Sequence, residues 1–533
     1  MKSFLLPALL TALLLIACGS GDSAEEASPL SVVPERAMIS IVLNDPAGMV
    51  RNIDGYIEDG APVLGENLLE NLICEQLAVS CLDSMTYRYG FDTSGQVVFW
   101  MESAMPQSMG MAASAPDFQL FTSLLEEMGA ELTDEEQIQG EDVYSMDTEE
   151  GTMYLAGVQG VVLMAMSSAK LEILISALAP AASFDEVVPA SLTMKFNLSM
   201  IGPMAAAQMP MARMLMMQGM AADTTMPAYV PAIMDVYMDG IESFLTQADM
   251  MELTLVTGSE DFVFEKRLTF IPGSSLAEML VSTSEVDMIQ YITQGDVATV
   301  RFQMPPEIAF EITKAFTEVF TSEISDENLY FWASMASNGA VSIYNDEFMH
   351  MVAAYELTEN ISIEEIAVMY SDYIEAFISG MEQNEEMLNS FNIQNNGIVQ
   401  IDGTDFYSMS MNIQPDTTLS MTFDYWLAVH DNALFIETAP QPDILLSIIS
   451  GDYTPAELEG TGEMAGEMSL AGYLNLIMTI SPNGMDIPEI GSDVIFTWNG
   501  GYSEGEIYSE MSMDGSDAVA TGFAFFSMIS AMQ

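Results

Sequence analysis

Basic residues are scarce in this chain. Its 533 residues include 11 lysines and arginines against 79 aspartates and glutamates, which gives a formal net charge of −68. Nucleic-acid binding through phosphates needs clustered Lys and Arg side chains to displace counterions. Adhesion to an anionic bilayer by a basic face needs the same residues. The composition therefore argues against both, and we expect no nucleic acid among the partners.

Histidines and catalytic motifs are also few. The two histidines, His350 and His430, lie on a predicted strand and beside a predicted turn, where nothing marks them as ligands or bases. The sequence has no H-E-x-x-H, no phosphate-binding G-x-x-x-x-G-K and no dinucleotide fingerprint after a strand. The G-x-S-x-G pattern at 501–505 has no histidine after Ser503, so we interpret it as a hairpin turn. We expect neither catalysis nor a cofactor.

Carboxylates are so numerous that acidic pairs arise by chance. Such pairs occur at Glu135/Glu136, Glu149/Glu150, Glu364/Glu365 and Glu385/Glu386. They could serve acid–base chemistry only if they converged in a cleft. We expect solvated helix faces and loops, and a carboxylate-based hydrolase is a less favoured alternative.

Long apolar runs are absent from the chain after its N-terminal segment. None there reaches the ~18 residues that would indicate a membrane span. The N-terminus itself has Lys2, an apolar run over 4–16 and the sequence Leu-Ile-Ala-Cys ending at Cys18. This pattern resembles the lipobox of bacterial lipoproteins. The resemblance implies that residues 1–17 are a signal peptide and that Cys18 becomes lipidated. A membrane is then one partner, through the lipid anchor.

The segment after the lipobox is polar, small and acidic. Residues 18–30 are expected to form a flexible tether. No Asp follows Cys18, which in many such lipoproteins favours the outer membrane over the inner one. We therefore expect a lipid-anchored protein of the cell envelope, on the periplasmic or surface side.

Only two other cysteines are present, Cys74 and Cys81. An oxidising envelope favours a disulfide between them. Residues seven apart on one helix rise about 10.5 Å, beyond the ~7 Å that a disulfide spans between Cα atoms. The disulfide therefore predicts that the preceding helix ends before Cys81. Two buried free thiols are the alternative.

An internal repeat organises the rest of the chain. The segment Gly-Glu-Asp-Val-Tyr-Ser-Met at 140–146 recurs as Gly-Thr-Asp-Phe-Tyr-Ser-Met at 403–409. Each copy continues with a strand, a turn (159–160 and 431–432), a second strand and a helix. A strand followed by a proline-led helix precedes both copies, so the order of elements repeats.

We infer a tandem duplication, with a first lobe at 31–290 carrying a Met-rich helical insertion and a second lobe at 291–533. Alternating strands and interspersed helices predict an α+β fold. Each lobe is expected to be a twisted antiparallel sheet with helices packed on one face. This pattern resembles duplicated bacterial envelope proteins that form a domain-of-unknown-function family, over most of residues 31–533.

Methionine is abundant, with 47 residues, and it is concentrated in one stretch from 204 to 220. Thioethers suit Cu(I), and the candidate ligand-binding residues are Met209, Met211, Met214, Met217 and Met220. Methionine also replaces leucine as an adaptable apolar filler. We favour an amphipathic helix here, and soft-metal binding is the alternative.

These features predict a lipid-anchored envelope protein with a non-catalytic binding or scaffolding role. The partner is an unidentified envelope protein. The alternative is a carrier or sensor of hydrophobic ligands, such as acyl chains, in a Met-lined cavity. A mean hydropathy of +0.25 makes the carrier attractive, although a large core would also account for it.

Overall fold

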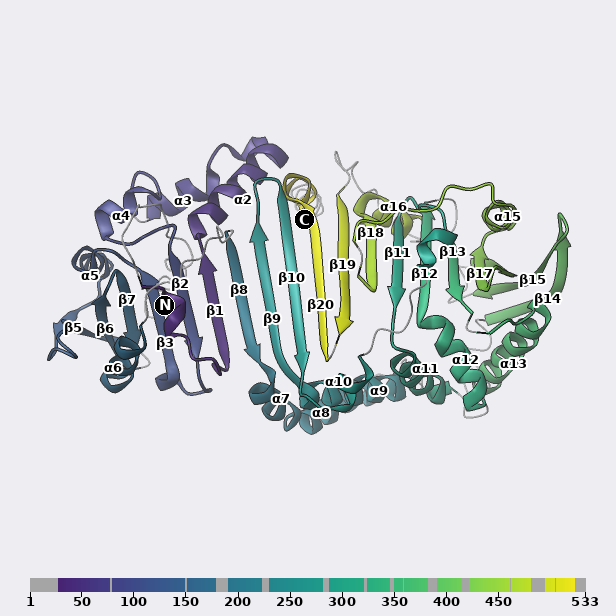
Figure 1. Cartoon of the computed structure of the whole chain (residues 1–533), viewed down its shortest axis with the longest axis horizontal. Helices are drawn as coiled ribbons and strands as arrows, with labels where there is room; N and C mark the ends of the chain where they lie inside the picture. Colours follow the sequence, from purple (N-terminus) through teal and green to yellow (C-terminus); the bar gives the residue numbers. More distant parts are fainter. Residues whose placement is uncertain are drawn as a thin grey trace. The chain divides into compact units, whose positions relative to one another are not determined.

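The structure is a computed structural model of the whole chain (Figure 1). It describes these residues: 27–76, 79–148, 151–178, 190–222, 230–280, 287–320, 324–345, 349–357, 359–381, 391–413, 421–460, 462–480, 494–503 and 505–522. The predicted signal peptide, Cys18 and the first part of the predicted tether lie outside the described residues.

The chain divides into two compact units. Unit 1 contains residues 1–201, 249–268 and 512–533, and unit 2 contains residues 202–248 and 269–511. These units differ from the two lobes inferred from the repeat, because 202–248 group with the second copy and 512–533 with the first.

Unit 1 is built on an antiparallel sheet. Its strands are β1 (Ile39–Asn44), β2 (Gln96–Met101), β3 (Met109–Ser114), β4 (Leu132–Asp134), β5 (Val143–Thr148), β6 (Gly151–Val158), β7 (Val161–Ala165), β8 (Ser191–Asn197) and β9 (Ala248–Thr257). They pair in the order β9–β8–β1–β2–β3–β7–β6–β5–β4.

The helices of unit 1 connect these strands. They are α2 (Pro46–Gly60), α3 (Leu68–Gln76), α4 (Ser84–Tyr89), α5 (Phe118–Glu127) and α6 (Ser168–Ala177), with short 3₁₀ turns η1 (Pro29–Val32), η2 (Pro62–Leu64) and η3 (Pro106–Ser108). Asp45 starts α2 by accepting a hydrogen bond from the Gly48 amide, and Pro46 occupies its first turn. Asp117 and Ser167 cap α5 and α6 in the same way.

The strands of unit 2 are also antiparallel. They are β11 (Ala298–Gln303), β12 (Asn338–Asn345), β13 (Met349–Glu356), β14 (Phe391–Ile401), β15 (Thr404–Ile413), β16 (Met421–His430), β17 (Ala433–Thr438), β18 (Met464–Ser469) and β19 (Ile495–Ser503). They pair in the order β19–β18–β11–β12–β13–β17–β16–β15–β14.

The helices of unit 2 are α8 (Met209–Ala222), α9 (Val230–Gln247), α10 (Ser275–Met279), α11 (Pro306–Phe320), α12 (Asp326–Ala336), α13 (Ile363–Met381), α15 (Asp443–Ser450) and α16 (Leu470–Ile480), with the 3₁₀ turn η4 (Met288–Tyr291). Four elements have residues in both units: α7 (Leu198–Ala206), β9, whose Ala248 belongs to unit 2, β10 (Asp261–Phe270) and β20 (Glu506–Asp514).

The two strand orders are identical when β1 is matched with β11, β2 with β12 and so on to β9 with β19. The helices fall in matching places, since α2 and α11 follow the first strand and α6 and α15 follow the seventh. The predicted α+β class and the duplication are therefore confirmed. Equal order across nine strands is a stronger sign of one ancestral fold than the short sequence repeat.

The repeat also holds residue by residue. Tyr144 lies opposite Leu155 in the first copy, and Tyr407 lies opposite Leu427 in the second. The predicted hairpin turns are present, because Gln159 and Gly160 both have positive φ, as do residues 431 and 432. Such turns match the twist of the two strands that they join.

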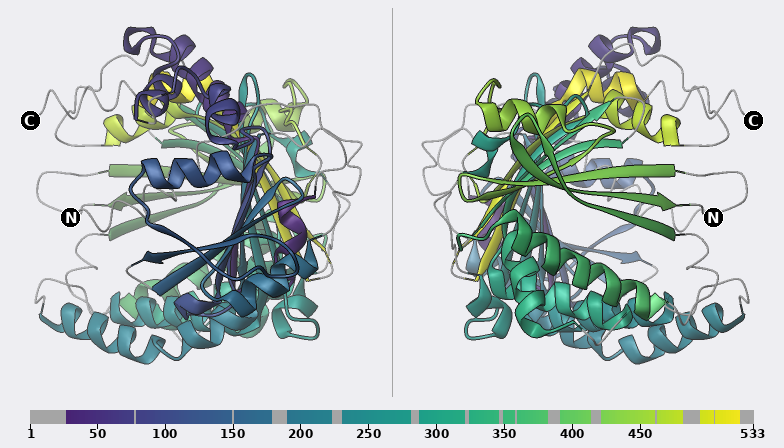
Figure 2. Two further views of the ribbon diagram at one scale, coloured as in Figure 1. Left: turned by 90° about the vertical axis from the view of Figure 1, so that its left-hand side faces the viewer. Right: turned by 90° about the vertical axis from the view of Figure 1, so that its right-hand side faces the viewer.

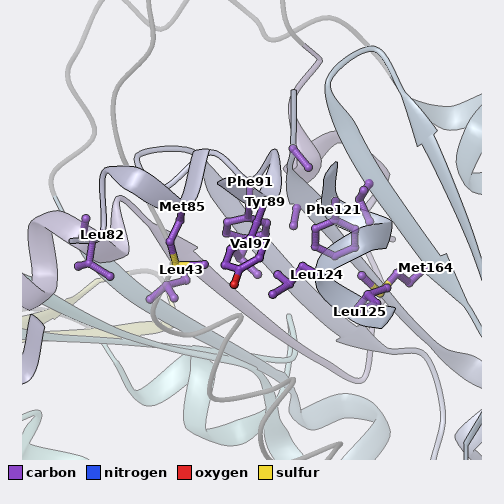
Figure 3. Close-up of a cluster of buried hydrophobic side chains, with 14 of the residues drawn as sticks. Leu43, Leu82, Met85, Tyr89, Phe91, Val97, Phe121, Leu124, Leu125 and Met164 are labelled. Atoms are coloured by element: carbon purple, nitrogen blue, oxygen red, sulfur yellow. The ribbon is translucent and has the colours of Figure 1, made fainter. Parts of the chain in front are cut away.

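Side chains from both faces of the unit 1 sheet are buried. On one face, α4 and α5 cover the sheet, and Met85, Phe121 and Leu124 meet Leu43 and Val97 (Figure 3). On the other face, the helix α6 and the turn η1 cover a separate cluster of apolar residues. Neighbouring residues alternate between the two clusters, as with Val97 and Val98.

Unit 2 repeats this arrangement. Phe406 belongs to the cluster beneath α15 and η4, whereas Tyr407 belongs to the cluster beneath α12 and α13. The prediction of helices on one face is therefore wrong in that detail. The reason is that strands such as β7, with all five residues buried, have no polar face to leave in water.

The copies differ at two places, of which the first is the predicted Met-rich insertion. The first copy carries α7, α8 and α9 over the Met-rich stretch. The second carries α13, which is 19 residues long against 10 for its counterpart α5. In the part of the chain that the structure describes, no helix is long and apolar enough to span a membrane.

Candidate functional site

The Met-rich insertion is the main departure from the repeated fold. The part of α7 that belongs to unit 2 contacts the C-terminal part of α9. A Cβ on Gly202 would lie 1.9 Å from the carbonyl oxygen of Leu245, so only glycine permits this approach. Phe244 of α9 then packs edge-to-face on Phe270, with ring centroids 6.1 Å apart. These contacts hold the helices of the insertion in place.

Charged side chains link α8 to α9. Arg213 of α8 forms an ion pair with Asp235, with Nε and Oδ1 3.5 Å apart, and a second ion pair with Asp239. The two aspartates are four residues apart and therefore share one side of α9. The charged side of each helix thus faces the other helix.

Apolar side chains of α8 and α9, and Met204 at the end of α7, are exposed. We call the set the α8–α9 surface; it comprises Met204, Met211, Met214, Leu215, Met216, Tyr237 and Ile241. Met211, Met214 and Leu215 are 54%, 53% and 59% exposed. On α9 only Met238 is buried.

An ordinary amphipathic helix in water turns its apolar stripe to the core, whereas α8 has apolar side chains on its exposed side as well as on its half-buried side. At about 100° per residue, Met211 and Leu215 lie on the side of α8 away from Arg213, whereas Met214 lies about 100° from it. Tyr237 and Ile241 lie on the side of α9 away from Asp235. Several large apolar side chains exposed on neighbouring helices of so acidic a protein are typical of a contact site.

The five predicted methionine ligands lie on different sides of α8. At about 100° per residue, Met209 and Met211 are about 160° apart around the helix. Met211 and Met214 are exposed, whereas Met209, Met217 and Met220 are half-buried. Soft-metal binding by these five residues stays a prediction.

A small hollow lies beside α8. It has a volume of about 270 Å³ and is lined by Met209, Pro210, Arg213, Met214 and Glu242. Two methionines contribute to it, in keeping with the Met-lined cavity of the carrier hypothesis. A guanidinium and a carboxylate also line it, and charged groups are poor surroundings for an acyl chain.

A buried ionisable pair occurs in unit 2 at a place the sequence did not mark. His350 Nε2 lies 2.9 Å from Glu437 Oε1, and Glu437 is fully buried. The Glu437 carboxylate also accepts hydrogen bonds from the backbone amides of Ile444 and Leu445, at 3.4 and 2.9 Å. It therefore caps the N-terminus of α15. His350 and Glu437 are 87 positions apart in the sequence, so no local sequence pattern reveals this pair.

The two cysteines are free thiols in the structure. Helix α3 ends at Gln76, before Cys81, as the disulfide argument required. Cys74 is buried in the core beneath the helices of unit 1, whereas Cys81 is half-buried. The structure therefore does not support the predicted disulfide. Burial, with smaller effects of Glu70 and Cys81, raises the pKa of the Cys74 thiol to about 11.

Other sequence motifs have structural roles. The G-x-S-x-G pattern lies where β19 runs toward β20, and these strands pair, as a hairpin requires. The acidic pairs at 135–136 and 364–365 are exposed, and those at 149–150 and 385–386 lie outside the described residues. Within the described ranges, no three His, Cys, Asp or Glu side chains gather closely enough to hold a metal ion.

Comparison with known proteins gives little. No family model matches the sequence, and no curated protein matches it. Among solved structures, crystal form IV of TP0453 aligns over 46% of this chain and 81% of that chain, with 12% identity and a TM-score of 0.26. Crystal form III covers 50% and 90%, with 11% identity and a TM-score of 0.25. At these TM-scores the likeness carries no argument.

Proposed function

We propose that this protein is a lipid-anchored component of the cell envelope that acts by binding a partner through the α8–α9 surface. The observation that carries the proposal is the exposure of several large apolar side chains on α8 and α9. Ion pairs join the two helices, and Met211, Met214 and Leu215 are each more than half exposed. Covering these apolar side chains would provide a favourable free energy of association.

The composition supports a surface that binds a specific partner. Acidic side chains over the rest of the chain keep it soluble and oppose non-specific association. Methionine side chains adapt to the shape of what they meet, which is typical of binding surfaces. The favoured partner is an envelope protein with an apolar contact surface.

The carrier function is the second candidate. It is favoured by the hollow that Met209 and Met214 help to line, and weakened by Arg213 and Glu242 in the same lining. Native mass spectrometry of the purified protein would show a bound lipid if the carrier function were correct.

The binding function is tested by placing a charge on α8. Leu215→Glu should leave the fold intact, because this side chain is 59% exposed. It should shift the protein from a large complex toward free protein in native gels of detergent-solubilised envelopes. Ile173→Glu is the matched control, since Ile173 is 58% exposed on α6 of unit 1. If both variants and the natural protein show the same share of large complex, the proposal is contradicted.

A further inference from the structure

The strand β14 forms one edge of the unit 2 sheet. It has 11 residues and is the longest of the described strands. Its residues pair with β15, and no other described strand pairs with it. Helix α13 lies along one face of β14, β15 and β16 (Figure 2, right). The outer edge of β14 therefore presents unpaired backbone N–H and C=O groups.

This edge carries few of the features that protect natural sheet edges. Its sequence, Phe-Asn-Ile-Gln-Asn-Asn-Gly-Ile-Val-Gln-Ile, contains no charged residue and no proline, in a chain with 79 acidic residues. Edge strands usually avoid pairing with other chains by being short or by carrying charges, prolines or bulges. Only the bulge is present, between Asn395 and Gly397.

The duplication supplies an internal comparison. The equivalent edge strand of the first copy, β4, has three residues, Leu132–Asp134. Glu131, Glu135 and Glu136 flank it, so this edge is both short and acidic. The same position in one ancestral fold is thus protected in the first copy and open in the second. An edge kept long and uncharged is suited to strand addition.

We propose that the free edge of β14 pairs antiparallel with β14 of a second copy of this chain, across a two-fold axis. An uncharged strand is the place where two copies with a net charge of −68 can meet at the lowest electrostatic cost. The antiparallel arrangement also keeps the acidic turns at Asp402 of the two copies at opposite ends of the paired strands.

The register of β14 supports self-pairing. Ile393 and Ile398 lie opposite Met411 and Tyr407 of β15 and therefore point to the same face of the sheet. In a two-fold antiparallel pair, residues that face each other point to the same side. Ile393 of one copy then lies opposite Ile398 of the other, and the contact occurs twice.

The oligomeric state tests this proposal. Sedimentation velocity of the purified full chain with Cys18→Ser should show a monomer–dimer equilibrium. Dimerisation should strengthen as NaCl is raised from 0.05 to about 0.5 M, because salt screens the repulsion between two acidic copies. A dimer held by opposite charges would instead weaken as NaCl is raised.

Charge exchange locates the contact. Ile393→Glu and Ile398→Lys should each weaken the dimer about tenfold, because each disturbs both symmetric apolar pairs. A mixture of the two variants should recover dimer, since the carboxylate introduced at position 393 of one copy then faces the ammonium group introduced at position 398 of the other. Ile173→Glu should leave dimerisation unchanged. Circular dichroism and thermal unfolding confirm that each variant is folded.

Three results would overturn the proposal. The first is a chain that stays monomeric at about 100 µM in 0.5 M NaCl. The second is a dimer that both folded β14 variants leave intact. The third is a mixture of the variants that dimerises no better than either variant alone. A fourth result also rejects self-pairing: the chain is monomeric, and its β14 variants no longer bind a different protein that the natural chain binds. The edge would then pair with a strand of that protein.

Discussion

At the residue scale, the environment of a side chain rather than its type sets its chemistry. Cys74 and Cys81 are seven positions apart in sequence, yet the first is buried in the unit 1 core and the second is half-buried. The sequence predicted only that α3 ends before Cys81, from helix geometry and a disulfide that the structure does not support. It could not predict the burial of Cys74, which depends on strands far along the chain.

This difference in environment predicts unequal reactivity of the two thiols. Because the pKa of Cys74 is raised to about 11, only about one molecule in a thousand holds the thiolate at pH 8. Cys74 should therefore react with iodoacetamide about a hundredfold more slowly than an ordinary thiol, and its rate should rise about tenfold per pH unit up to pH 11. Peptide mass spectrometry after timed labelling measures both cysteines. Equal rates would contradict the described burial, and a Cys74–Cys81 disulfide in the purified protein would restore the sequence prediction.

At the scale of elements, the sequence predicted the repeat, the hairpins and most helices. These features depend on nearby residues, such as Gly140 and Gly403, which both adopt positive φ at matching turns. The strand order depends on partners that lie far apart, and no local pattern contained it. The sequence did not predict that both faces of the sheet are covered. Uninterrupted apolar runs such as β7 fit buried strands and buried helices alike, so they do not show which faces are buried.

Equivalent core positions of the two copies should respond alike to the same substitution. Leu155 and Leu427 are both fully buried and occupy matching places opposite Tyr144 and Tyr407. Leu155→Ala and Leu427→Ala should each reduce the free energy of unfolding by about 2–5 kcal/mol, because each leaves a cavity. Urea denaturation measures both losses. A loss below about 1 kcal/mol at only one of the two positions would show that the copies are not packed equivalently.

At the scale of the whole molecule, the structure accounts for a composition that is both strongly acidic and rich in apolar residues. The acidic side chains are spread over a body whose sheets are packed on both faces, so a large core accounts for much of the positive mean hydropathy. The remaining exposed apolar side chains include those of the α8–α9 surface. The sequence predicted an amphipathic helix there. It could not predict which side would face solvent, because that depends on the ion pairs between α8 and α9.

Membrane attachment is expected to depend on one thiol. If Cys18 carries the lipid anchor, Cys18→Ser should move the protein from the membrane to the soluble fraction, because two or more acyl chains provide most of the membrane affinity. Immunoblotting of fractionated cells measures the shift, and Cys81→Ser is the matched control. An unchanged distribution of Cys18→Ser protein would contradict the anchoring proposal.

The central claim is that the α8–α9 surface is a contact surface. It is tested most directly by a photo-cross-linking amino acid at position 214 in cells that produce the anchored protein, with the same amino acid at position 173 as control. The account predicts a discrete adduct of higher mass from position 214 and none of that mass from position 173. The same adducts from both positions, or none from position 214, would contradict it.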